Sequence, residues 1–200
     1  MKTLKIAVGV FAFFLLTIFA QAQQVDAAIG LGTVSSAGSN FSDVFTNFKQ
    51  SLRGGTFMSF SGDALIKGNL GVEGEVAWRT SKTLYAGALP YRPLFWDFNA
   101  IYAPRFSKFF GVEALAGIGA ESARFYTGIN CSGFTGCTNY TSRSHFMGDF
   151  GGGLRFYPFG NFFVRPEARL YLINNNAEFS SGRAVRYGIS LGYTFGGKYY

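Results

Sequence analysis

The chain has 200 residues, including 24 Phe, 11 Tyr and 27 Gly, but charged residues make up only 14% and the formal net charge is +7. The basic residues form no run, which argues against a nucleic-acid partner. Beyond the first 22 residues no stretch of 18 apolar residues occurs, which excludes a membrane-spanning helix there. An excess of aromatic residues and glycine with few charges is typical of strands that face lipid.

The N-terminal segment has the features of a secretory signal peptide. A basic start is followed by an apolar run over residues 6–19 and by Ala20-Gln21-Ala22, the small-x-small pattern that signal peptidase cleaves. The apolar run is shorter than the roughly 20 residues of a membrane span, although an uncleaved anchor is the alternative. We expect residues 1–22 to be removed, leaving residues 23–200 as one domain.

The remaining sequence alternates between apolar and polar residues with a period of two, which indicates β-strands. In residues 70–79, for example, Val72 and Trp78 share one face while Glu75 lies on the other. Two segments, 25–34 and 56–65, alternate less clearly. The clear segments are 70–79, 94–102, 110–125, 146–156, 164–172 and 185–195. Together they predict eight strands, an even number, as bacterial single-chain barrels require.

The connections between these segments alternate in length. Short ones lie near residues 66–69, 104–108 and 158–162, and long ones at 35–55, 81–92, 126–144 and 174–184. Short periplasmic turns and long extracellular loops are typical of outer-membrane barrels. The sequence therefore predicts an all-β fold, an eight-stranded antiparallel up-and-down transmembrane β-barrel.

The first long connection has a periodicity of its own. Phe41, Val44, Phe45, Phe48 and Leu52 follow the spacing of an amphipathic helix. We expect a short helix that folds over the barrel rim. Contact with the membrane surface or with a partner is the alternative.

One proline conflicts with a regular strand. Pro166 lies in the middle of the segment 164–172, and a closed barrel has no edge at which its missing N–H is harmless. We expect a bulge or a locally broken ladder there.

The two faces of the strands predict which side chains meet lipid and which fill the lumen. The aromatic face is expected to face the bilayer, with Trp96, Tyr102, Phe150, Phe156, Tyr187 and Tyr193. The interior of an eight-stranded barrel is only wide enough for side chains to fill, so the charges of the other face should pair there. A catalytic or proton-conducting role for these carboxylates is the alternative. The expected lumen ion-pair network contains Glu73, Glu75, Arg79, Asp97, Glu113, Glu121, Asp149, Arg155, Arg165, Glu167, Arg169 and Arg186.

The two cysteines, Cys131 and Cys137, lie in one Gly/Ser/Thr-rich loop. In a secreted chain this spacing predicts one local disulfide. A zinc site would need further ligands, and His145 is the only histidine. We therefore expect no metal and no cofactor.

An enzymatic reading would rest on Ser142, Ser144 and His145, with Glu121 nearby in the sequence. A Ser–His pair must be within hydrogen-bond reach. Neighbouring residues of a strand point to opposite faces, and so do residues three apart, so neither serine would reach His145. We expect no catalytic site and no enzyme.

The chain resembles the small outer-membrane β-barrel superfamily, which includes the OmpA transmembrane domain and OmpX-type proteins. The resemblance rests on the predicted signal peptide, the eight alternating segments, the alternation of short and long connections and the final segment 187–195. The resemblance implies residence in the bacterial outer membrane, with membrane lipid and the assembly machinery as partners. It also implies a structural or surface-binding role through extracellular loops, with an additional surface ligand as one option. Members of the superfamily include lipid A-modifying enzymes.

Three alternatives to a closed structural or surface-binding barrel remain. The first two are a lipid A-modifying enzyme and a narrow porin, and a lumen filled by ion pairs argues against the porin. The third is a soluble lipocalin-like ligand-binding barrel. That barrel would leave the aromatic face in water as a large exposed apolar patch.

Overall fold

The computed structural model describes residues 24–36, 52–85, 88–128, 130–132, 136–175, 179 and 181–196. The expected signal peptide, residues 1–22, lies outside the described residues, and so does the predicted amphipathic segment except for Leu52. Within the described part of the chain, no helix is long and apolar enough to cross a bilayer.

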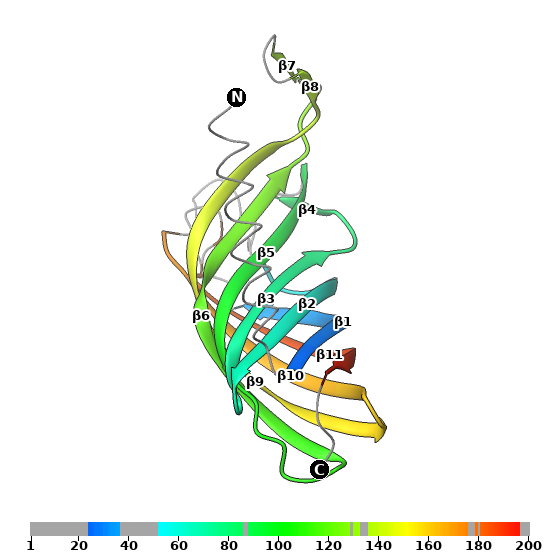
Figure 1. The fold of residues 1–200 in the computed structure, drawn as a ribbon. Coiled ribbons are helices and arrows are strands. Elements are labelled where there is room, and N and C mark those ends of the chain that lie inside the picture. The colour runs from blue at the N-terminus through cyan, green and yellow to red at the C-terminus, as the bar shows by residue number, and fades with distance from the viewer. Residues whose placement is uncertain are drawn as a thin grey trace, which may run out of the picture.

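Eight long antiparallel strands close into a barrel (Figure 1), which confirms the predicted fold class. Each strand pairs with its neighbour in this series, and the first pairs with the last, so the topology is up-and-down. The strands are β1 (Gln24–Ser36), β2 (Thr56–Lys67), β3 (Leu70–Arg79), β5 (Leu89–Tyr102), β6 (Phe110–Phe125), β9 (Thr141–Phe159), β10 (Phe162–Ile173) and β11 (Arg183–Phe195).

Three further short strands lie beyond the barrel wall. β4 (Thr83–Tyr85) pairs with the start of β5, within a stretch that the sequence predicts to be a loop. β7 (Asn130–Ser132) and β8 (Gly136–Thr138) form a separate two-stranded ladder, which Figure 1 shows past the ends of β6 and β9. The strands β5, β6 and β9 continue pairing toward these elements. β5 and β9 therefore begin earlier than the sequence pattern predicts.

The barrel has one end with short turns and one with long connections. At the short-turn end, Gly68 and Gly160 adopt φ values of 59° and 55°, which tight turns between strands require. The described ends of the chain meet at this end too, because Val25 of β1 pairs with Phe195 of β11. The strand ends that lead into the four long connections lie at the opposite end of the barrel, as the loop lengths predict.

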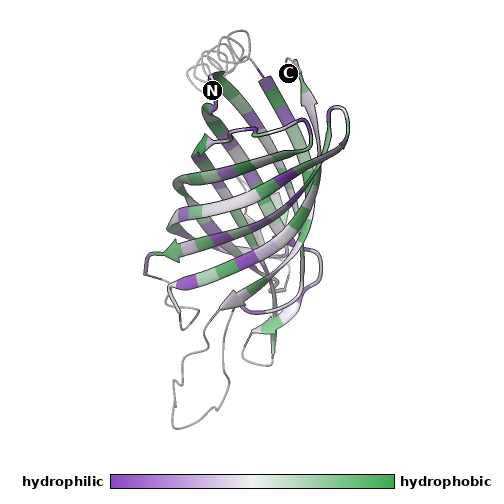
Figure 2. Cartoon of the chain, turned by 90° about the horizontal axis from the view of Figure 1, so that it is seen from below, coloured by the Kyte–Doolittle hydropathy of each residue, from purple (hydrophilic) through white to green (hydrophobic). Residues whose placement is uncertain are grey.

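Side chains alternate between the lumen and the outer surface along every strand. In β11, Leu191 is 62% exposed and the preceding Ser190 only 1%. Figure 2 shows the same alternation as green and purple bands along the strands. The aromatic residues predicted for the lipid face lie outward, with Trp96, Tyr102, Phe150, Phe156 and Tyr187 exposed and Tyr193 partly exposed.

Pro166 lies on the outward face of β10, where the ladder to β9 is interrupted. Pairs are formed at Val164 and again at Glu167 with the same register, and the two residues between them are skipped. The bulge itself lies between Phe162 and Val164. The expected break of the ladder is therefore present, because proline cannot donate the missing hydrogen bond.

Candidate functional site: the lumen and the outer wall

The centre of the lumen is occupied by arginines that each contact several carboxylates. Arg155 of β9 is 2% exposed and reaches three acids on three other strands. Its guanidinium contacts Asp26, lies 2.5 Å from a carboxylate oxygen of Asp63 and lies 2.6 Å from one of Glu113. One side chain thus ties four strands together across the barrel.

Three more arginines continue this network toward the loop end. Arg165 lies 3.1 Å from Glu113, and Arg169 lies 2.6 Å from Glu73. Arg169 and Arg186 are directly opposite each other on β10 and β11. The carboxylate of Glu75 lies 3.2 Å from Arg169 and 2.5 Å from Arg186, so one anion bridges the two cations. Polar neighbours complete the network: Asn99 donates to Asp97 at 2.7 Å and to Asp149 at 3.1 Å, and Ser190 donates to Glu167 at 3.3 Å.

The structure joins ten of the twelve predicted network residues in ion pairs. It also adds Asp26 and Asp63, which are not among the predicted members. Both sit at inward positions of β1 and β2, so the period-two pattern contained the signal. The ten residues are Glu73, Glu75, Asp97, Glu113, Asp149, Arg155, Arg165, Glu167, Arg169 and Arg186.

The other two predicted members, Arg79 and Glu121, are also buried in the lumen. Arg79 donates hydrogen bonds to the backbone carbonyls of Leu52, at 3.1 Å, and of residues 53 and 54. It also lies 5.5 Å from the ring centroid of Phe57. Among the described residues, the partners of Arg79 are these backbone carbonyls of the first long connection and not the carboxylate that the sequence predicts.

The loop end of the lumen is filled by apolar and aromatic side chains. Phe95 of β5 stacks on Tyr171 of β10 with ring centroids 4.8 Å apart, and Tyr91 lies 5.2 Å from Phe179. This cluster, the loop-end cluster, was not foreseen from the sequence. Its buried members are Val34, Leu52, Phe57, Ala77, Tyr91, Phe95, Ala123, Phe125, Met147, Tyr171, Ile173, Phe179 and Ala184.

Smaller apolar clusters lie at the short-turn end. Phe163 packs against Tyr157 with ring centroids 5.6 Å apart, and its ring occupies the space that a Cβ on Gly192 would need. The guanidinium of Arg155 lies 5.1 Å from the Phe163 ring centroid, so the network rests directly on this cluster. The ion pairs are therefore enclosed between apolar side chains at both ends of the lumen.

The buried charges do not balance in number. Nine carboxylates are buried in the barrel, compared with five arginines. The sequence predicts seven acids against five arginines, and Asp26 and Asp63 account for the difference. Within the described residues, no group of three or more His, Cys, Asp or Glu side chains is arranged to hold a metal ion.

The residues considered for catalysis are divided between the two faces of the wall. His145 of β9 lies directly opposite Glu121 of β6, on the inward face. Ser144 lies opposite Ser122 on the outward face, where their hydroxyl oxygens are 2.5 Å apart. Ser144 and His145 therefore point away from each other, as the sequence predicts. The geometry brings an acid to His145 but leaves Ser144 on the other side of the wall.

The two cysteines lie in the hairpin beyond the barrel. Cys131 of β7 is directly opposite Cys137 of β8 in the ladder. This register is compatible with the predicted disulfide, whose formation stays a prediction.

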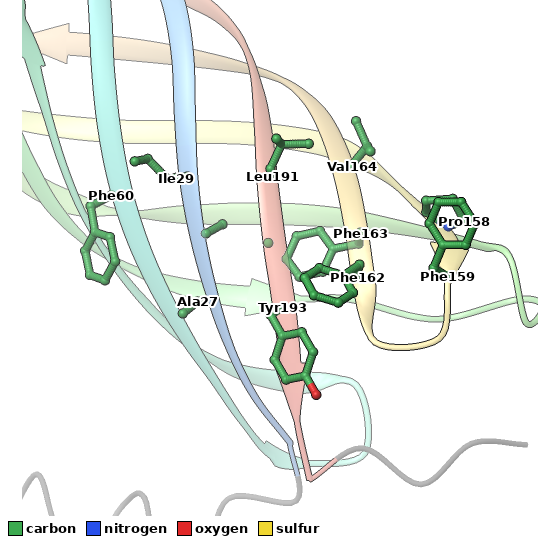
Figure 3. Close-up of a pocket in the computed structure, with 12 residues that line it drawn as sticks. Ala27, Ile29, Phe60, Pro158, Phe159, Phe162, Phe163, Val164, Leu191 and Tyr193 are labelled. Atoms are coloured by element: carbon green, nitrogen blue, oxygen red, sulfur yellow. The ribbon is translucent and has the colours of Figure 1, made fainter.

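The outer wall carries an apolar groove near the short-turn end (Figure 3). It runs over β1, β11 and β10, where the small side chain of Ala27 lies between Phe60 on one side and Phe162 on the other. The groove encloses about 590 Å³, and Ile29 and Leu191 add to its apolar lining. Such a surface suits contact with acyl chains rather than with water.

A closed barrel with an apolar outer wall and charges inside defines the class of small outer-membrane β-barrels. Residues 6–195 match the outer membrane protein beta-barrel domain family, and the chain belongs to that family. The protein is therefore a bacterial outer-membrane barrel. A search of curated proteins finds no significant match.

Solved structures of the same fold include two bacterial surface proteins. Ail, the attachment invasion locus protein of Yersinia pestis, is 16% identical over 86% of this chain and 98% of Ail, with a TM-score of 0.55. Neisserial surface protein A is 13% identical over 86% of this chain and 96% of that protein, with a TM-score of 0.58. At these identities the likeness concerns the fold.

Proposed function

We propose that this protein is a closed outer-membrane barrel that conducts no solutes and acts as a structural or surface-binding protein. The observation that supports the proposal is the set of side chains buried in the lumen. A network of buried ion pairs lies between the aromatic loop-end cluster and the cluster around Phe163. An eight-stranded barrel has no room for a water path beside such side chains.

Conductance in planar bilayers tests this part of the proposal. The folded protein should give no steady current under conditions in which a reconstituted porin, measured in parallel, conducts. A migration shift between unboiled and boiled samples on a gel establishes that the reconstituted protein is folded. A large, stable channel would overturn the closed lumen and make the protein a porin.

We further propose that the long-loop end binds a polyanionic surface ligand. All nine acids among the described residues are buried in the lumen, whereas Arg53, Lys82, Arg143 and Arg183 are exposed at the loop end. Such a surface attracts anions. Ail was crystallised with a heparin analogue, sucrose octasulfate, which is an example of a polyanion on this fold.

Retention on immobilised heparin tests the ligand class. Substituting Arg143→Gln and Arg183→Gln should lower the salt concentration needed for elution, because each lost cation removes a screened electrostatic contact. The pair Lys67→Gln and Lys108→Gln removes the same charge at the short-turn end and should elute like the wild type. If both pairs of substitutions lowered the elution salt concentration equally, retention would depend on net charge alone, which would contradict a loop-end site.

No enzymatic function is proposed. The arrangement of Ser144 and His145 on opposite faces of β9 gives a lipid A-modifying activity no support from this pair.

A further inference from the structure

Two arginines lie directly opposite each other on the outward face of the wall. Arg92 of β5 pairs in register with Arg124 of β6, close to the long-loop end. Like charges opposite each other on one face of a sheet destabilise it. Inside the lumen the comparable pair, Arg169 and Arg186, is bridged by the carboxylate of Glu75. An anion in the equivalent place would relieve the repulsion within the outward pair.

Among the described residues, no carboxylate pairs with these two arginines. Every acid among the described residues is buried inside the barrel, on the opposite side of the wall. One amino group of Arg92 donates to the carbonyl of Thr80 at 3.0 Å, and its Nε has no partner in the described part of the chain. The guanidinium of Arg124 lies over the ring of Tyr140, 5.2 Å from its centroid, and is paired with no acid among the described residues.

A third cation lies beside the pair. Lys82 follows Thr80 by two residues, and its ammonium group is 3.7 Å from the ring centroid of Tyr126. Tyr126 in turn follows Arg124 by two residues, and its backbone N–H donates to the carbonyl of Pro90 at 2.8 Å. Lys82, Arg92 and Arg124 therefore form one cluster, the outward cation cluster.

The position of this cluster along the strands places it at the level of lipid headgroups. On β5 and β6 the outward rows run from Trp96 and Ala120, through Leu94 and Ser122, to the two arginines. Trp is enriched at the membrane interface. Four residues of a strand span about 13 Å, and a tilt of about 45° reduces the rise above Trp96 to roughly 9 Å. The polar Ser122 already marks the end of the apolar band.

We propose that the outward cation cluster binds the phosphate group of a membrane lipid in the leaflet at the long-loop side. Arginine guanidinium groups bind phosphate in a bidentate manner, and a phosphate between Arg92 and Arg124 takes the bridging role that Glu75 has in the lumen. Lys82 adds a second point of contact for a doubly charged headgroup. The ligand belongs to the bilayer rather than to the solution, because the cluster faces sideways, directly above the apolar band.

Binding of diphosphoryl lipid A tests the proposal, with the folded full-length mature protein in maltoside micelles, which contain no phosphate. Native mass spectrometry counts the bound lipid as its concentration rises. Substituting Arg92→Gln together with Arg124→Gln should weaken binding at least about tenfold, because charge-assisted hydrogen bonds are lost at both arginines. The double substitution Lys67→Gln and Lys108→Gln should leave binding unchanged, and the heat-dependent gel shift verifies that both variants are folded.

Two outcomes would overturn the proposal. Equal binding of lipid A by the wild type and the Arg92/Arg124 variant would remove the cluster from lipid recognition. Displacement of lipid A by millimolar inorganic phosphate would show a site for small anions. A lipid-binding site also contacts the acyl chains beside Trp96, so phosphate alone should not displace the lipid. Weaker binding of dephosphorylated lipid A to the wild type, with no such difference in the variant, supports the proposal.

Discussion

The centre and the loop end of the lumen are both lined by inward residues of the same strands, yet they are filled in different ways. In the centre, Arg155 and Arg169 hold carboxylates from most of the strands. At the loop end, rings such as Phe95 and Tyr171 stack on each other. The aromatic region excludes water, and in a dry environment charges attract strongly but are costly when left alone. The ion pairs therefore depend on the apolar clusters that enclose them.

The largest expected effect comes from breaking the central network. Substituting Arg155→Ala and Arg169→Ala should cost roughly 3–5 kcal/mol for each site, because the remaining carboxylates stay buried without partners. Urea unfolding in lipid vesicles measures the loss of unfolding free energy. In the extreme case the variant no longer folds. Arg183→Ala, an exposed arginine on β11, is the control and should change stability little. A double variant as stable as the control would contradict a structural role for the network.

The next largest effect concerns the loop-end cluster. Phe95→Ala removes a fully buried ring and should cost roughly 3–5 kcal/mol, because it leaves a cavity beside Tyr171. Phe98→Ala, three residues along β5, removes a ring that is 61% exposed toward lipid. Lipid fills that space, so only the transfer free energy of roughly 1–2 kcal/mol is lost. Equal losses in the same unfolding experiment would contradict an enclosed aromatic region.

A smaller effect separates two acids of the network. Glu113 is 2.6 Å from Arg155 and 3.1 Å from Arg165, whereas the closest arginine contact of Asp97 is 3.5 Å from Arg169. Glu113→Gln should therefore cost roughly 1.5–3 kcal/mol, the value of lost charge-assisted hydrogen bonds. Asp97→Asn should cost less than about 1 kcal/mol, because carboxylates outnumber arginines in the lumen. A larger loss of unfolding free energy for Asp97→Asn than for Glu113→Gln would show that the acids in excess over the arginines contribute more to stability.

The smallest effect on the barrel is expected from the hairpin outside it. Oxidation of Cys131 and Cys137 closes a short loop, which contributes about 2 kcal/mol by loop entropy to the hairpin alone. Mass spectrometry of unreduced protein should find no free thiol. Reduction should speed proteolysis of the hairpin and leave the urea midpoint of the barrel unchanged. Two free thiols in the isolated protein would contradict the disulfide.

The strands, their two faces and the alternation of short and long connections follow from the amino-acid sequence alone. Side chains of a strand alternate by local geometry, so the positions of Leu191 and Ser190 on opposite faces follow from the period of two. The same reasoning placed Ser144 and His145 on opposite sides. The break in the ladder at Pro166 could also be predicted, because the missing N–H is a local property of proline.

Which inward side chains meet depends on how the strands are arranged around the closed barrel. Arg155 and Asp26 are 129 positions apart, and their contact depends on the register of every strand around the closed barrel. For the same reason Arg79, although inward as predicted, meets backbone carbonyls of the first long connection instead of a carboxylate. The period of two determines on which face of the wall a side chain lies. The stagger of the strands determines how far along the barrel axis it lies, and therefore which other side chains it can contact.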